Sequence, residues 1–118
     1  VVVEDFAVLG AMVGVHQFCR IGESSFTGAS TKLSKDVPPF GRVIGERARF
    51  AGVNTVGLER RGYGREKIAE LKHAFHLLYR SKLRLEPAMK RVEEECAGSQ
   101  EVERLLRFLR SSGRGVTR

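Results

Sequence analysis

Compact apolar residues recur at every sixth position through the first third of the chain. Five aliphatic residues and one threonine share this period: Val3, Leu9, Val15, Ile21, Thr27 and Leu33. Smaller side chains stand four residues after each of the first five, namely Ala7, Val13, Cys19, Ser25 and Thr31. A six-residue period matches neither the 3.6-residue repeat of a helix nor the alternation of an ordinary sheet. It is typical of a parallel β-helix, in which each hexapeptide forms one short strand and one corner.

Glycine follows three of these apolar positions directly, at Gly10, Gly22 and Gly28. Inside an α-helix each glycine would cost about 1 kcal/mol, so the glycines argue against a helix here. We expect them to free the backbone at the turns. Three hexapeptides make one coil, so the repeat predicts about two coils whose aliphatic side chains point inward. Because the chain begins at Val1 rather than at Met, we expect more of the same repeat upstream.

The repeat is predicted to stop at Pro38 and Pro39, because two consecutive prolines remove backbone donors and force an extended path. A further strand is expected over residues 41–45. The first domain, residues 1–50, is therefore predicted to be the end of a hexapeptide-repeat β-helix with its exit strand. Residues 51–64 are predicted to form an irregular connector.

Helical periodicity begins at about residue 65. Apolar residues share one face over 65–81 and again over 86–96, which predicts two helices. Ser99 is placed to cap a third helix, since its side chain can accept a bond from the first turn. Residues 65–118 are thus predicted to form a small C-terminal domain of three helices. Such a domain buries little by itself, so we expect it to pack on the β-helix or on a neighbouring subunit.

The composition is that of a globular protein with a basic surplus. The 118 residues carry a net charge of +7, most of it in the second half of the chain. A surplus of this kind attracts an acidic partner. No apolar run is long enough for a transmembrane helix, and the N-terminus does not have the pattern of a signal peptide. Nucleic-acid binding is disfavoured because aromatic residues are not interleaved with the basic ones.

The two cysteines, Cys19 and Cys96, are expected to be buried reduced thiols rather than a disulfide. Reduced thiols fit the cytoplasm. His16 and Cys19 are the one close pair of candidate zinc ligands in the repeat, and two ligands do not make a zinc site. His73 and His76 lie three residues apart on the first predicted helix, again with no third ligand nearby in sequence. We expect no metal and no cofactor.

Four segments together resemble one enzyme family. Gly14–Gly22, which contains His-Gln-Phe-Cys, looks like the signature coil of the UDP-N-acetylglucosamine acyltransferases. Asp36–Phe40 resembles the exit of that family from its β-helix. Gly52–Tyr63, with its Arg-Arg-Gly, is similar to the connector of the family, and Arg110–Gly115 to its tail. The resemblance covers essentially the whole chain, in register and without a large gap.

The resemblance implies a left-handed parallel β-helix, an exception to the usual right-handed crossover. It also implies a homotrimer with active sites in clefts between subunits. The family moves a 3-hydroxyacyl chain from acyl carrier protein to the sugar 3-hydroxyl of UDP-N-acetylglucosamine, the first step of lipid A biosynthesis. Its general base is a histidine in an earlier coil, upstream of Val1. This chain is therefore expected to be a C-terminal part of the enzyme, without catalytic residues of its own and inactive alone.

The resemblance also assigns candidate binding residues. His16 and Gln17 match positions that line the substrate cleft, where an imidazole and an amide can bond to sugar or acyl oxygens. Asn54, Arg60 and Arg61 match positions that reach the nucleotide, and the guanidinium fork suits phosphate oxygens.

Two further positions bear on specificity. Ala29 matches the residue that sets acyl-chain length in the family, where relatives often have glycine. Val56 stands where relatives often have an acid, so a hydrogen bond that the acid would accept is missing. The basic helical residues are candidate contacts for acyl carrier protein, which is acidic, and they are Arg65, Lys67, Lys72, Arg80 and Lys82.

Other functions fit parts of the sequence. One alternative is another hexapeptide acyltransferase, for example one that uses acetyl-CoA. A hexapeptide carbonic anhydrase would need three histidines at a metal, and the repeat region has one. A third alternative is a non-catalytic trimeric hexapeptide scaffold or binding module.

Overall fold

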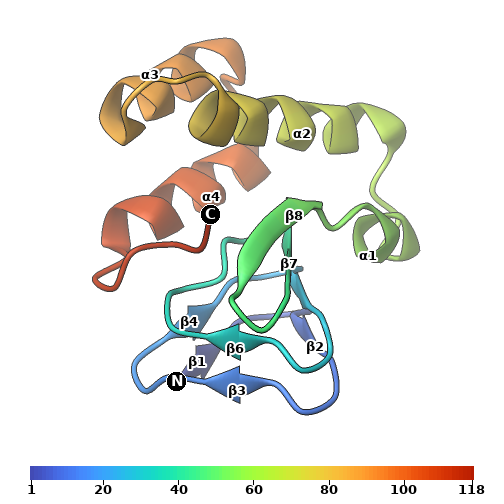
Figure 1. The fold of residues 1–118 in the computed structure, drawn as a ribbon. Helices are drawn as coiled ribbons and strands as arrows, with labels where there is room; N and C mark the ends of the chain where they lie inside the picture. Colours follow the sequence, from blue (N-terminus) through green and yellow to red (C-terminus); the bar gives the residue numbers. More distant parts are fainter.

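The computed structural model describes residues 1–118 and begins with a short β-helix (Figure 1). Its coils are built from six two-residue strands: β1 (Val2–Val3), β2 (Val8–Leu9), β3 (Gly14–Val15), β4 (Arg20–Ile21), β5 (Phe26–Thr27) and β6 (Lys32–Leu33). The strands pair in parallel as β1 with β4, β2 with β5 and β3 with β6. Val2 lies opposite Arg20, so one coil is three hexapeptides, as the sequence predicts.

The repeat continues past the two prolines in a shortened form, which corrects the prediction that it stops there. Val37 forms a parallel bridge with Ile21, and β7 (Gly41–Ile44) pairs in parallel with β5. Phe26 lies opposite Arg42, so this coil is two residues shorter than the one before. The strand β8 (Arg49–Val53) then turns back antiparallel on β7 and ends the sheet β2-β5-β7-β8.

The corners do not use glycine, contrary to the prediction. The left-handed backbone conformation falls every six residues on Phe6, Met12, Phe18, Ser24 and Ser30, with φ between 52° and 68°. Gly22 has an ordinary φ and serves a different purpose, because a Cβ there would lie 2.7 Å from Cα of Pro39. Gly10 is placed likewise against the backbone of Ala29. These glycines allow neighbouring coils to approach closely.

The inward stacking of the apolar residues is confirmed for the second coil. Ile21, Thr27 and Leu33 are buried there, and Ile21 and Leu33 pack with Val37 and Val43 into a small core. Of their counterparts in the first coil, Val3 and Leu9 are exposed, with Leu9 39% exposed, and Val15 is half-buried against the same small core. The first coil therefore presents an apolar edge.

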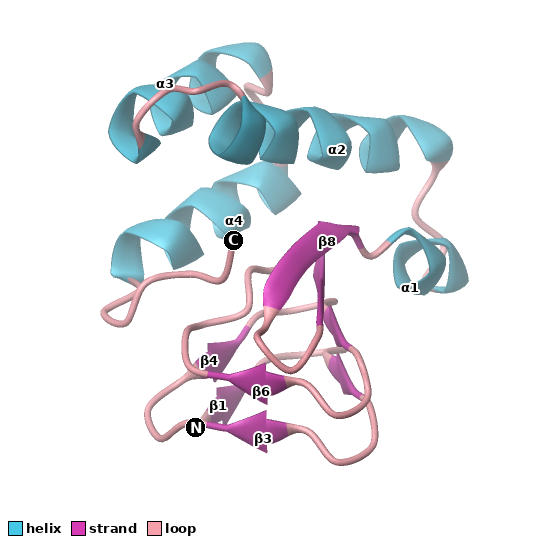
Figure 2. Ribbon diagram, in the orientation of Figure 1, coloured by secondary structure: helices cyan, strands magenta, loops and turns pink.

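Four helices follow, one more than the sequence predicts (Figure 2). They are α1 (Thr55–Arg60), α2 (Arg65–Arg80), α3 (Leu85–Glu95) and α4 (Gln100–Ser111). The bounds of α2 and α3 agree with the two predicted ranges to within one residue, and α4 is the third predicted helix. The oxygen of Ser99 accepts a bond from the Val102 N–H, which confirms the predicted cap. The helix α1 lies inside the stretch that was expected to be irregular, and β8 extends into residues 51–53 of the same stretch. None of the four helices combines the length and the hydropathy that a membrane-spanning helix requires.

The helices share one core that reaches into the β-helix. It contains Phe40 from the shortened coil and Leu58 from α1, together with the inner faces of α2, α3 and α4. Phe50 on β8 packs its ring 4.6 Å from Phe75 and edge-on to Tyr79, so α2 rests directly on the last strand. This contact connects the sheet to the helices, as expected for a domain too small to stand alone.

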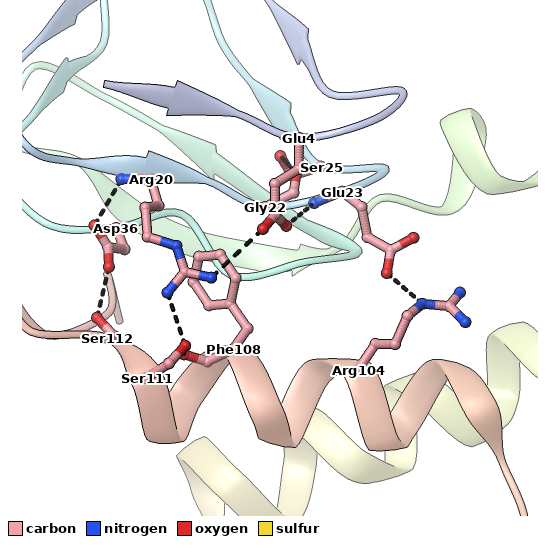
Figure 3. Close-up of polar contacts among 10 residues, drawn as sticks. All are labelled: Glu4, Arg20, Gly22, Glu23, Ser25, Asp36, Arg104, Phe108, Ser111 and Ser112. Atoms are coloured by element: carbon pink, nitrogen blue, oxygen red, sulfur yellow. Dashed lines mark hydrogen bonds and ion pairs between the residues drawn. The ribbon is translucent and has the colours of Figure 1, made fainter.

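The helix α4 and the tail fasten the helices to the coils (Figure 3). Arg104 forms an ion pair with Glu23, and the guanidinium of Arg20 donates to Ser111 while lying 4.2 Å from the Phe108 ring centroid. The carboxylate of Asp36 accepts bonds from the Arg20 N–H and from the hydroxyl of Ser112. The tail then pairs with the coil through a bridge between Asp36 and Val116.

Candidate functional site

An open groove of about 740 Å³ runs along the outer surface of the sheet β2-β5-β7. Val8, Phe26 and Arg42 occupy matching positions on the three paired strands, so their side chains form an outward column in the groove. Phe6 and Ser24 line the groove from the adjacent corner, and α1 closes its other side. The groove is thus a product of the coil stacking and of the connector.

Asn54 holds α1 in place and is buried. Its side-chain oxygen accepts a bond from the Gly57 N–H at 3.3 Å, which caps the helix, and its amide nitrogen donates to the Ser24 carbonyl at 3.0 Å. Gly57 has no room for a Cβ because the Asn54 amide lies against it. Both polar ends of Asn54 are therefore engaged within the protein, although the residue lines the groove.

Arg60 and Arg61, at the end of α1, face the groove. The guanidinium carbon of Arg61 lies 3.1 Å from the centroid of the Phe6 ring, which holds its planar group over the aromatic face. Neither arginine belongs to one of the ion pairs of the structure. No Asp or Glu lines the groove. An acid-free groove of this kind suits an anionic ligand.

The other predicted site residues lie at different corners. His16 and Gln17 are exposed between β3 and β4, with His16 Nδ1 3.1 Å from the Gln17 carbonyl. Ala29 is exposed between β5 and β6. None of these three lines the groove. One chain therefore brings Asn54, Arg60 and Arg61 together and leaves the remaining candidates apart.

Comparison with known proteins relates this architecture to a single family. The family model described as "Udp N-acetylglucosamine O-acyltransferase; Domain 2" matches residues 36–117. The chain belongs to this family. The chain is 42% identical over its full length to the acyl-(acyl-carrier-protein)–UDP-N-acetylglucosamine O-acyltransferase of Myxococcus xanthus (strain DK1622). That alignment spans 46% of the relative, so the chain is about half as long as the curated relatives it matches.

Solved structures of the acyltransferase family have the same fold over nearly the whole chain. The UDP-N-acetylglucosamine acyltransferase of Bacteroides fragilis matches with a TM-score of 0.94 at 35% identity, covering 99% of this chain and 46% of that one. The Arabidopsis enzyme matches with a TM-score of 0.92 at 32% identity, covering 98% and 44%. The family resemblance inferred from the sequence is thus confirmed.

The five basic residues predicted to contact acyl carrier protein differ in how many partners they have within the chain. Lys67 is bound to Glu70 at 3.0 Å and to Glu101 at 3.2 Å, and the hydrogen bond to Glu70 raises the pKa of Lys67. Four other predicted contacts are not in ion pairs and are at least partly exposed: Arg65, Lys72, Arg80 and Lys82. Lys67 is therefore the least available of the five for a partner protein.

The two histidines of α2 do not meet at one point. His73 Nε2 lies 2.9 Å from a carboxylate oxygen of Glu95, whereas His76 has no such partner. Both cysteines are buried and unpaired, as predicted. Burial raises the pKa of each thiol above its usual range.

The sequence analysis did not identify most of the residues that line the groove, among them Phe6 and Arg42. Phe6 belongs to an outward series with the same six-residue spacing as the inward one, continued by Met12 and Phe18. This series could have been found from the period alone. Arg42 carries no such signal, because the shortened coil changes its register relative to Phe26.

Proposed function

We propose that the protein containing this chain transfers a 3-hydroxyacyl chain from acyl carrier protein to the 3-hydroxyl of UDP-N-acetylglucosamine. This is the first step of lipid A biosynthesis. The observation that carries the proposal is the acid-free groove, in which Arg60 and Arg61 lie where the family resemblance expects the nucleotide. The names of relatives such as the Myxococcus xanthus protein agree with this reaction.

In the proposed reaction the sugar hydroxyl oxygen attacks the thioester carbonyl carbon. A carbon–oxygen bond forms, the carbon–sulfur bond breaks, and the hydroxyl proton passes by way of a general base to the departing thiolate, which leaves as a thiol. The family resemblance assigns the base to a histidine outside this chain. Within the chain, the guanidinium groups of Arg60 and Arg61 bind phosphate oxygens and so hold the sugar in place.

We further propose a homotrimer of left-handed β-helices with the reaction site between subunits. His16, Gln17 and Ala29 belong to the proposed substrate cleft, yet in one chain they stand at corners away from Arg61. A second copy is what would bring them to the same ligand. The proposed compartment is the cytoplasm, where acyl carrier protein is available. The basic helical residues are the proposed docking contacts for acyl carrier protein. The proposed reaction requires no cofactor.

The test is a transfer assay with the full-length protein, 3-hydroxyacyl carrier protein and UDP-N-acetylglucosamine. Arg61→Ala is expected to raise KM for the nucleotide sugar about 10- to 100-fold, because a charge-assisted bond is lost. Arg91→Ala is the matched control, since Arg91 lies on α3, forms an ion pair with Glu95 and does not line the groove. A well-folded wild-type protein without transfer activity would overturn the proposal and favour a non-catalytic binding scaffold.

A further inference from the structure

Arg42 is a third arginine in the groove, and it comes from the sheet rather than from α1. Its neighbour in the column of outward side chains is Phe26, at the paired position on β5. The one hydrogen bond of its side chain is long, 3.4 Å from Nη2 to the Ala51 carbonyl. Arg42 is exposed and forms no ion pair. Its charge is therefore available to a ligand.

The groove gathers three guanidinium groups without any carboxylate to balance them. Arg60 and Arg61 stand on the α1 side and Arg42 on the sheet side. Val56, 60% exposed, lines the groove where an acid would have reduced the positive potential. Uncompensated like charges repel, so the arrangement is stabilised by an anion that contacts both sides.

We propose that Arg42 binds the diphosphate of the nucleotide sugar, together with Arg60 and Arg61. The proposal rests on the proposed function for the identity of the nucleotide sugar, and the groove itself contributes three arginines and no acid. Arg60, the last residue of α1, and Arg61, its C-cap, can bind one phosphate from the α1 side of the groove. A second phosphate gives the ligand a charge for Arg42 on the opposite wall, and the guanidinium fork can bond to it in a bidentate manner.

The proposal is tested first by binding, which needs no turnover. Isothermal titration of the full-length protein with UDP and with uridine compares wild type, Arg42→Gln and Arg49→Gln. Arg49 is the matched control because it is an exposed arginine on β8 that does not line the groove. Arg42→Gln is expected to weaken the binding of UDP about 10- to 100-fold and to leave the affinity for uridine unchanged. Arg49→Gln is expected to leave both unchanged.

Three results would overturn the proposal. Equal weakening of UDP and uridine by Arg42→Gln would mean that the variant distorts the groove. Unchanged UDP binding would mean that Arg42 does not contact the diphosphate. If Arg49→Gln weakened UDP binding to the same extent, the effect of Arg42→Gln would come from the change in net charge and not from a contact with the diphosphate. Thermal unfolding of each variant checks that folding is intact, which we expect because Arg42 is exposed.

A kinetic experiment separates the two possible sources of phosphate. Arg42→Gln is expected to raise KM for UDP-N-acetylglucosamine and to leave KM for the acyl carrier protein unchanged. The opposite pattern would assign Arg42 to the phosphodiester arm of the carrier and would overturn the diphosphate proposal. If the wild type binds UDP but transfers no acyl group, the proposed function fails while the binding result on Arg42 still stands.

Discussion

Replacing Gly22 by alanine should destabilise the β-helix, because the chain of the next coil passes too close for a methyl group. A Cβ on Gly22 would lie 2.7 Å from both Cα and Cδ of Pro39, whereas carbon atoms prefer separations of about 3.5–4.0 Å. Pro39 cannot easily move away. The Gly22 N–H donates to the Val37 carbonyl and the Phe40 N–H donates to the Glu23 carbonyl, both at 2.9 Å.

The expected magnitude follows from two opposing effects. Forcing a methyl group into a packed site costs about 1–3 kcal/mol, and the rigid backbone neighbour here favours the upper end. Replacing glycine by alanine also reduces the entropy of the unfolded chain, which returns about 0.4–1 kcal/mol. The free energy of unfolding should therefore fall by about 2 kcal/mol. Gly14→Ala is the matched control, because its Cβ would meet only the flexible side chain of Lys32 at 3.9 Å.

Urea unfolding of the full-length protein, followed by circular dichroism at one fixed protomer concentration, measures both variants. Gly14→Ala should unfold at or slightly above the wild-type midpoint, and Gly22→Ala well below it. If both variants unfold at the same urea concentration, the close approach between Gly22 and Pro39 does not constrain the coil. The account of these glycines as spacers between coils would then be wrong.

Two further predictions concern buried polar and thiol groups. Asn54→Ala should lower the free energy of unfolding by about 1–3 kcal/mol in the same urea assay, because the cap of α1 and the bond to Ser24 are both lost; a variant with unchanged stability and an altered KM alone would contradict this. Cys19 and Cys96 should react with a thiol reagent only after unfolding, since burial both covers them and raises their pKa. Rapid labelling of either thiol in the native protein would refute this second prediction.

The coil could be read from the sequence because its geometry is local. An inward side chain at every sixth residue requires a corner between each pair, and the observed pairing of Val2 with Arg20 follows from three such units. The left-handed conformation of the corner residues, unlike their spacing, could not be predicted in the same way. Phe6, Met12 and Phe18 adopt the left-handed conformation that usually favours glycine, so their residue types did not indicate a positive φ.

Long-range features carried no local signal. The helix α1 is short and contains Gly57, so it has no periodicity to detect. The sequence analysis assigned Asn54 a binding role and did not predict that it also caps this helix. The contact of the tail with Asp36 joins residues far apart in sequence. The candidate site residues came from the family resemblance, but their division among separate corners became visible only in three dimensions. Arg42 lies in the groove because the shortened coil changes the pairing register, and no sequence motif predicts that change.

The contact between the tail and Asp36 has a consequence for how such proteins diverge. The Asp36 N–H donates to the Gly115 carbonyl, and the Thr117 N–H donates back to the Asp36 carbonyl, so the segment between them is closed at its base. The family model begins and ends at almost the same two residues. A segment closed in this way can be appended to solenoids of different length as one piece, since its attachment needs only the last coil. Coils added upstream of that last coil would leave the bonds of the segment to Arg20, Glu23 and Ser24 unchanged.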